Sequence, residues 1–463
     1  MKYRTILTCL ACCFVLMFLG KLPILLAQET PPETHPASET PASAPETPTP
    51  PAEVPALETP APETPNVPPP AANALVIPPE KMTPPLSLQV LGYNMYSQLA
   101  MQADSQGGGN ICFSPQLLAK QLTALRFGAD GQTATEVFSV FPARATVPQT
   151  SDFLRQIDAS AAKIPEGAQH PQALPTFGQA NAIWVPTDHP IVEQYINGLK
   201  TGLATDLYAA DFKNQRDAAA TVINAWVRDT TGGRLISVIA EPYEVGLPGE
   251  ISVVTTGLVC AAPRLIVPFN QKFSGPNEFH LVSGEKISVP MMRQIGPYYY
   301  AEVSNLQILM MPCVEENLRL ILLLPAEGQL KTLEKLMTPD FLQQRFAPLQ
   351  PMNVDVIMPQ LKTTACLDLT ETLKNMGMTT ISTEKAELTN MSQAIEKGPL
   401  CLSKLMHATQ MTVVEQINNP QQETPPAQKQ FYVNRPFVFL LWNTASGTPL
   451  VIGRVTNPQL GFR

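Results

Sequence analysis

Residues 413–442 read VVEQINNPQQETPPAQKQFYVNRPFVFLLW. An apolar run ends near Glu415, a polar segment with several prolines follows, and a dense apolar run resumes at Phe431. Apolar runs of this length are typical of β-strands, whereas polar residues clustered with proline are typical of surface loops. The sequence therefore predicts an exposed loop between two strands near the C-terminus.

The segments around this stretch predict both helices and strands. Early apolar residues recur at helical spacing, namely Leu88, Leu91, Met95 and Leu99. Later apolar runs, RLILLLPAEG (319–328) and VDVIMPQLK (354–362), predict strands that end at Pro325 and Pro359. The final RPFVFLLWNTASGTPLVIGRVTNP (435–458) predicts a hairpin whose polar turn contains Gly447. The predicted fold class is α+β with a substantial sheet.

The N-terminal part predicts export and a spacer. In residues 1–27, Lys2 and Arg4 precede a long apolar stretch, which is typical of a signal peptide; an uncleaved N-terminal anchor is the alternative. Residues 28–85 are rich in Pro, Glu and Thr, so they predict a disordered, extended linker. Residues 86–463 form one predicted domain. We expect a secreted or cell-envelope protein, which contacts a membrane only if residues 1–27 stay uncleaved.

Composition and motifs exclude several functions. The net charge is −8 and no block of Lys or Arg occurs, which argues against nucleic-acid binding. Histidine is sparse and no zinc spacing or catalytic motif occurs, so we expect no enzyme, no metal site and no cofactor. The odd set of domain cysteines predicts buried free thiols: Cys112, Cys260, Cys313, Cys366 and Cys401. We expect a monomer.

The segment FYVNRPFVFLL (431–441) resembles the C-terminal signature of the serpin family, with Asn434, Pro436 and Phe437 in matching places. Further segments resemble the family in the same order: NICFSP (110–115), LRFGADGQTATEV (125–137), INAWVRDTTGGRL (223–235), GEKISVPMM (284–292), LTETLKNMGM (369–378) and LSKLMHAT (402–409). The resemblance implies a large twisted mixed sheet, additional sheets and about eight or nine helices. It also implies that the polar segment is an exposed reactive-centre loop.

The resemblance implies a mechanism and site residues. In inhibitory serpins a serine or cysteine protease cleaves the loop, and the N-terminal part of the loop then enters the sheet as a new strand. Such a protease is therefore the implied partner. The implied hinge consists of Glu415, Gln416, Ile417, Asn418, Asn419 and Pro420. The candidate scissile region contains Thr424, Pro425, Pro426 and Lys429.

The hinge departs from the pattern of inhibitory serpins, which have glycine and threonine followed by small residues. Ile417 is β-branched and stiff where glycine would permit a turn. Pro420 removes a backbone donor from the segment that would enter the sheet. We predict that inhibition is weakened or lost. The alternative is a non-inhibitory serpin that acts as a binding, carrier or scaffold module.

The family's shutter, where the sheet opens, is only partly matched. Ser114 and His407 are the implied shutter pair, although His407 could equally be a satisfied core histidine. Three positions depart from the family: Leu117 for a second serine, Thr255 or Thr256 for an asparagine, and Leu265 for a tryptophan. These departures favour the prediction of weakened inhibition.

Overall fold

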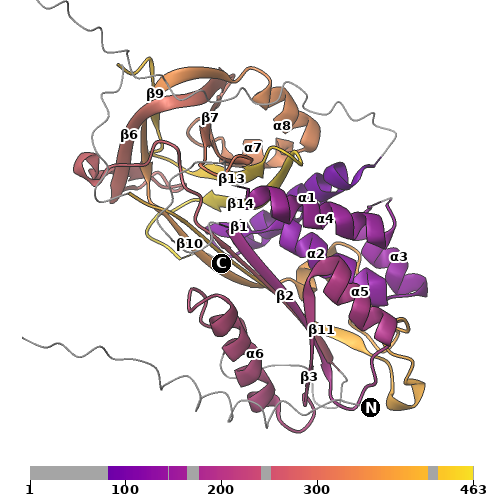
Figure 1. The fold of residues 1–463 in the computed structure, drawn as a ribbon. Coiled ribbons are helices and arrows are strands. Elements are labelled where there is room, and N and C mark those ends of the chain that lie inside the picture. Colours follow the sequence, from indigo (N-terminus) through magenta and orange to yellow (C-terminus); the bar gives the residue numbers. More distant parts are fainter. Residues whose placement is uncertain (1–81, 144, 164–176, 241–251, 416–425, 462–463) are drawn as a thin grey trace, which may run out of the picture. The chain divides into compact units, whose positions relative to one another are not determined.

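The computed structural model describes residues 82–143, 145–163, 177–240, 252–415 and 426–461. The chain divides into two units, Met1–Thr64 and Pro65–Arg463, and every described residue belongs to the second. The described residues contain nine α-helices and two β-sheets (Figure 1). This architecture confirms the predicted α+β class and the predicted number of helices. The helices are α1 (Pro84–Ser105), α2 (Pro115–Gly128), α3 (Gly131–Val140), α4 (Val147–Ala161), α5 (Glu193–Leu203), α6 (Arg216–Thr230), α7 (Leu330–Leu336), α8 (Pro339–Phe346) and α9 (Thr370–Asn375).

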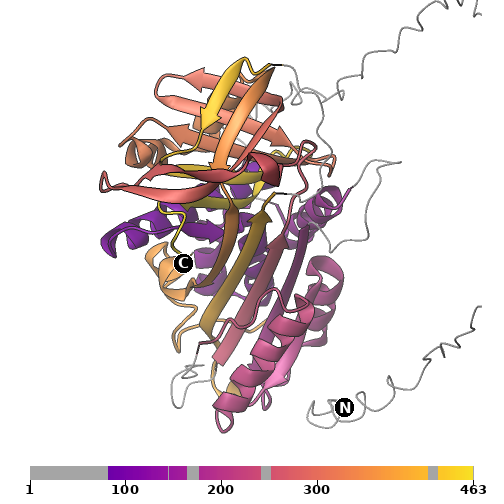
Figure 2. The same cartoon turned by 90° about the vertical axis from the view of Figure 1, so that its left-hand side faces the viewer.

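The first sheet has five strands of mixed direction. Its order is β10 (Leu361–Asp368), β11 (Cys401–Val413), β4 (Ser252–Ala261), β2 (Phe177–Pro186) and β3 (Thr205–Ala210). The two central neighbours, β11 and β4, run parallel, while β10 pairs with β11 and β2 pairs with β4 in antiparallel fashion. Figure 2 shows these long strands side by side.

The second sheet has nine strands. Its main path is β1 (Ile111–Phe113), β14 (Thr448–Val455), β13 (Phe437–Asn443), β8 (Leu318–Pro325), β7 (Leu306–Pro312), β6 (Lys286–Val303), β9 (Gln350–Pro359) and β12 (Lys429–Tyr432). The remaining strand, β5 (Gly275–His280), pairs with β6. The predicted ends of β8 and β9 at Pro325 and Pro359 are confirmed. The predicted hairpin is also confirmed, since β13 pairs with β14 in antiparallel fashion. In its turn Gly447 has a φ of 67°, a conformation that glycine adopts without strain.

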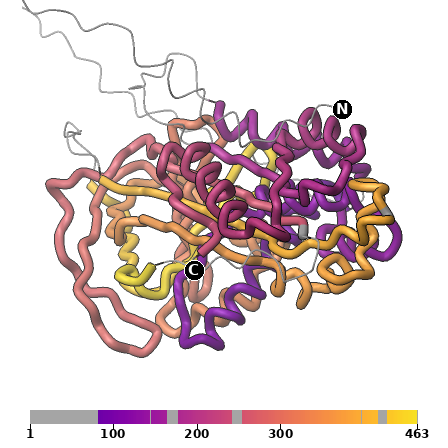
Figure 3. Tube along the Cα trace, turned by 90° about the horizontal axis from the view of Figure 1, so that it is seen from below, coloured from indigo at the N-terminus to yellow at the C-terminus, as the bar shows by residue number. Residues whose placement is uncertain are grey.

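Local sequence explains how the first helices begin. The Thr83 hydroxyl accepts a hydrogen bond from the Leu86 amide at 3.5 Å and caps α1, whose four predicted apolar residues are all buried. Ser114 caps α2 in the same way, with its Oγ 3.2 Å from the Leu117 amide, and Pro115 occupies the first turn. The C-terminal strand β14 packs against both helices. In Figure 3 the tube is indigo in the region of these helices and yellow toward the C-terminus.

Each face of the five-stranded sheet belongs to a different apolar cluster. One face packs against α2 and belongs to the large core, which also includes the nine-stranded sheet. The opposite face carries Trp184, Leu258 and Met406, which belong to a smaller cluster with Ile223 and Val227 of α6. Figure 1 shows that α6 lies on this side of the sheet, apart from helices α1 to α5. The β4–β11 pair is therefore covered on both faces.

Candidate functional site

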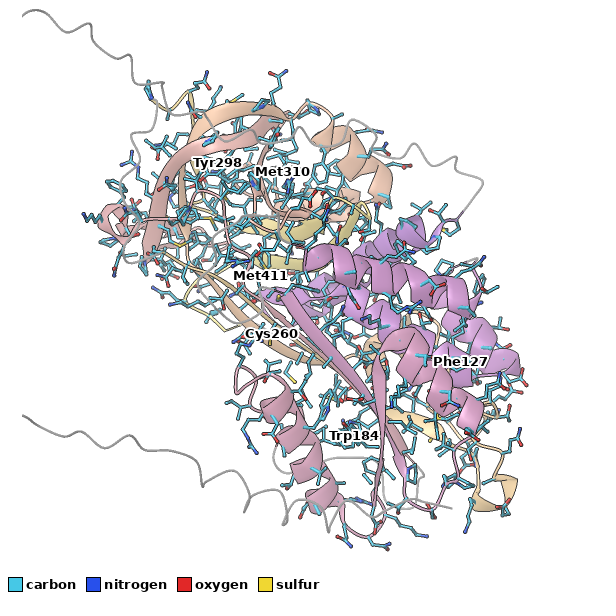
Figure 4. All side chains as sticks on the ribbon, viewed as in Figure 1. Phe127, Trp184, Cys260, Tyr298, Met310 and Met411 are labelled. Carbon is cyan, nitrogen blue, oxygen red and sulfur yellow. The ribbon has the colours of Figure 1, made fainter. Side chains whose placement is uncertain are left out.

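The candidate site centres on the parallel pairing between β4 and β11. Ten residue pairs join the two strands, from Cys401 opposite Ser252 to Met411 opposite Ala261, with one irregularity between Leu402 and Lys404. We call these paired residues the β4–β11 seam. Figure 4 labels Cys260 on β4 and Met411 on β11, near the end of the seam that leads to the predicted loop. The two strands are directly bonded, so an additional strand could enter only after they separated.

A polar cluster under α2 binds both strands of the seam. Gln121 extends from α2, and its Nε2 donates to the Met406 carbonyl at 2.9 Å and lies 3.3 Å from the Thr255 hydroxyl. His407 Nδ1 lies 3.0 Å from Gln121 Oε1, and the Ser114 amide donates to His407 Nε2 at 3.0 Å. Ser114, Gln121, Thr255 and His407 are completely buried. One helix side chain therefore hydrogen-bonds to β4 and β11 together.

The hydrogen bonds define the protonation state of His407. Because the Ser114 amide donates to Nε2, Nε2 is an acceptor and Nδ1 carries the proton, which it donates to Gln121 Oε1. Burial lowers the pKa of His407 to about 3, since charging the imidazole would leave it desolvated. His407 is therefore a neutral bridge between α2 and the seam at ordinary pH.

The predicted shutter pair does meet, through the Ser114 backbone amide and the imidazole. The residue opposite His407 is Gly257, however, and neither threonine reaches the imidazole. Thr255 bonds to Gln121, and Thr256 Oγ1 accepts the indole hydrogen of Trp184 at 2.9 Å. A Cβ at Gly257 would lie 2.8 Å from Gln121 Cδ, so glycine leaves the space that Gln121 occupies.

Gln121 is the residue that the sequence interpretation missed. Gln121 stands out only because it is a polar residue on a helix that is buried nearly throughout. That burial results from tertiary packing, so the sequence alone does not reveal it. Beyond the end of β4, Leu265 is buried and forms an isolated bridge with Cys313, which follows β7. The neighbouring Arg264 forms a 2.7 Å ion pair with the fully buried Glu315. This ion pair anchors the chain that leaves β4.

The predicted loop begins and ends at defined strands. Val413 ends β11, and Glu415 Oε2 accepts a 2.5 Å hydrogen bond from Gln360 Nε2, just before β10. The hinge residues Gln416, Ile417, Asn418, Asn419 and Pro420 lie outside the described residues, as do Thr424 and Pro425. Pro426 is described and exposed. Residues 414–428 are thus the connection between β11 and β12.

Two sequence-based placements need correction. Lys429 was predicted in the loop, but it is the first residue of β12 and pairs with Val354 of β9. The preceding Gln428 already bonds to Asn353, through its amide and its side chain, at 2.8 and 3.0 Å. The strand begins two residues before Phe431 because backbone groups, not side chains, determine the pairing. Cys366 was predicted to be buried but is exposed on β10, while the other four free cysteines are buried.

The three signature residues lie where β12 leads into β13. Asn434 accepts the His280 amide hydrogen at its carbonyl oxygen, 2.7 Å away, and so binds this turn to β5. Pro436 follows, half-buried, and the fully buried Phe437 begins β13. Within the described ranges, no cluster of three or more His, Cys, Asp or Glu residues could hold a metal ion. No described helix is both long and apolar enough to cross a membrane.

Comparison with known proteins gives consistent similarities. The family model described as Serpin (serine protease inhibitor) matches residues 87–458. Alpha-1-antiproteinase S of Cavia porcellus is 25% identical over 382 residues, which covers 81% of this chain and 90% of that protein. An uncharacterized serpin-like protein of Thermococcus kodakarensis is 27% identical, over 80% of this chain and 84% of its own.

Solved structures share the fold. The crystal structure of uncleaved ovalbumin matches with a TM-score of 0.72 at 21% identity, over 81% of this chain and all of the ovalbumin chain (100%). Human thyroxine-binding globulin complexed with thyroine matches with a TM-score of 0.71 at 23% identity, covering 81% and 99%. These likenesses concern the arrangement of helices and strands.

Proposed function

Since this chain belongs to the serpin family, whose model spans residues 87–458, we propose that residues 414–428 meet serine or cysteine endopeptidases as a substrate loop that does not trap them. Serpins are a protease-inhibitor family and not enzymes. Their members are mostly protease inhibitors, and some are non-inhibitory. The family therefore implies target proteases in general. Our proposal concerns what happens when such a protease binds residues 414–428, namely whether it is trapped or only cleaves the chain.

The sequence of the segment that would have to enter the seam carries this proposal. An inserted strand needs backbone donors and side chains that tolerate burial between β4 and β11. Pro420 offers no donor, and the neighbouring residues Asn418, Asn419, Gln421 and Gln422 have amide side chains. Each buried amide without a partner costs about 1–3 kcal/mol. Several such costs together offset much of the gain from new strand pairing.

The closed seam supports the same proposal. Opening it would break the direct β4–β11 pairing and would also remove Gln121 from at least one of its two strands. On the other side of the loop, Lys429 is already paired in β12. A protease binds its substrate by pairing with its backbone, so a basic residue whose backbone is already paired in a ladder is a poor cleavage site. Pro425 and Pro426 resist cleavage because proline fixes φ and lacks a donor.

A panel of serine and cysteine proteases tests the proposal. We expect slow cleavage within residues 414–428 and no protease–protein complex that survives SDS electrophoresis. The matched variant restores a small-residue hinge: Ile417→Gly, Asn418→Thr, and alanine at Asn419, Pro420, Gln421 and Gln422. A stoichiometric SDS-stable complex with the unmodified chain would overturn the proposal.

Thermal unfolding separates the two hinge sequences further. After cleavage of the loop, the unmodified chain should keep nearly the same melting midpoint, because Pro420 interrupts any new ladder. The hinge-restored variant should gain stability on cleavage, since each added backbone hydrogen bond contributes about 0.5–1.5 kcal/mol. A large gain in the unmodified chain would mean that its loop inserts despite Pro420.

We further propose that the protein acts outside the cytoplasm, where such proteases would meet it. The support is the charged and then apolar sequence of residues 1–27, followed by the proline-rich residues 28–85. Cell fractionation that recovers the full-length chain from the cytoplasm would contradict this location.

The second candidate function, a binding or carrier module, is favoured by a polar cavity beside β12.

A further inference from the structure

A polar cavity lies beside the strand that follows residues 414–428. It has a volume of about 400 Å³ and is lined by the turn between β6 and β7, the end of β8, and the chain from β12 to β13. Leu306 and Leu324 are its buried apolar lining residues. Sites for small molecules have volumes of roughly 300–1,000 Å³ and combine apolar walls with a few polar groups. This cavity therefore has the size of a small-ligand site.

Arg435 provides an incompletely bonded cation in this cavity. Its Nε donates to the Pro325 carbonyl at 2.7 Å, and its Nη1 donates to Asn434 Oδ1 at 3.0 Å. These two bonds fix the guanidinium plane and leave Nη2 for a further acceptor. In the described part of the chain, no carboxylate lies within ion-pair distance of Arg435. A carboxylate on a ligand would supply the missing acceptor, because the guanidinium fork matches it in shape and charge.

The surroundings of Arg435 favour the binding of a carboxylate. The side chain is half-buried, and burial lowers its pKa. Glu327, whose carboxylate lies 3.1 Å from His280 Nδ1, raises the pKa of Arg435 through space but forms no ion pair with it. A half-buried cation that has lost water gains more from a bound anion than an exposed one does.

The cavity also carries negative charge. Glu302 is an exposed residue of its lining, and its carboxylate accepts the Tyr300 hydroxyl hydrogen at 3.0 Å. Gln430 and Tyr432 of β12 also line the cavity, while their side-chain polar atoms contact residues outside it, Asp355, Asn277 and Glu278, at 3.4–3.5 Å. A simple anion would be repelled by Glu302, whereas a molecule with both charges would match the lining.

We propose that this cavity binds a small zwitterion of amino-acid or dipeptide size. The ligand carboxylate pairs with the Nη2 side of Arg435, and its ammonium group faces Glu302. Because β12 directly continues residues 414–428, the bound molecule contacts the strand at the end of that segment.

Titration calorimetry on the full chain tests this site with three probes. Glycylglycine carries both charges, glycylglycine amide lacks the carboxylate, and N-acetylglycylglycine lacks the ammonium group. We expect glycylglycine to bind most tightly and each of the other two to bind roughly tenfold or more weakly. Arg435→Lys should weaken both carboxylate probes about tenfold, because lysine keeps the charge but loses the fork.

Glu302→Gln provides an independent variant, since Glu302 is exposed and its change leaves Arg435 intact. It should weaken glycylglycine, which loses the partner of its ammonium group, and should strengthen N-acetylglycylglycine, which is no longer repelled. Glu285→Gln, which removes an exposed carboxylate away from the cavity, is the matched control and should change nothing. The proposal is wrong if no probe binds saturably up to about 10 mM. It is equally wrong if both Arg435→Lys and Glu302→Gln retain the affinity of the unmodified chain.

Discussion

Replacing Gln121 with methionine should loosen the β4–β11 seam selectively. Methionine has a similar length and is apolar, so Gln121→Met keeps the packing against Gly257 but removes three hydrogen bonds. The buried Nδ1–H of His407 loses its acceptor, which costs about 1–3 kcal/mol. Losing the bonds to Met406 and Thr255 adds about 0.5–1.5 kcal/mol each. We expect a total destabilisation of at least about 2 kcal/mol.

Hydrogen exchange can locate this loss within the molecule. A local change of about 2 kcal/mol corresponds to roughly 30-fold faster exchange of amides that open with the seam. We expect this acceleration for residues 254–261 and 404–411, and a smaller one for the β13–β14 hairpin. The matched control is Gln89→Met on α1, which removes a single bond to the Gly447 carbonyl and should leave the seam unchanged. Equal acceleration of the seam and the hairpin would refute a clamping role for Gln121.

Two further predictions follow from the same cluster. Between about pH 6.5 and 3 the unfolded His407 binds a proton that the folded one does not, since burial lowers its folded pKa to about 3. Stability should therefore fall by about 1.4 kcal/mol per pH unit as pH decreases, and denaturant titrations of His407→Gln should lack this slope. Gly257→Ala should lower the free energy of unfolding by about 1–3 kcal/mol, because its Cβ would lie 2.8 Å from Gln121 Cδ. Gly275→Ala, with nothing within 4 Å, is the control and should not destabilise the chain.

Local patterns were sufficient to predict much of the fold. Helical spacing identified α1, and prolines correctly marked the ends of β8 and β9, because proline interrupts strand pairing wherever the strand lies. Lys429 could not be assigned in this way. It is a polar, exposed residue of an edge strand, and only its backbone bonds to β9 place it there. Gln121 gave no usable signal either, since its role depends on a helix, two strands and a glycine from separate parts of the sequence.

The seam and the loop sequence control different parts of any insertion reaction. The bonds of Gln121 stabilise the closed sheet, so they raise the barrier to separating β4 and β11. Ile417, Pro420 and the amide side chains near them act later, because they reduce the gain once a strand has entered. Removing the hydrogen bonds of Gln121 alone should therefore make the seam open more readily without making insertion favourable. Restoring the hinge alone should make insertion favourable but leave it slow. Only the combination of Gln121→Met with the restored hinge removes both obstacles, so the rate of protease trapping should rise more in the combined variant than in the hinge variant alone.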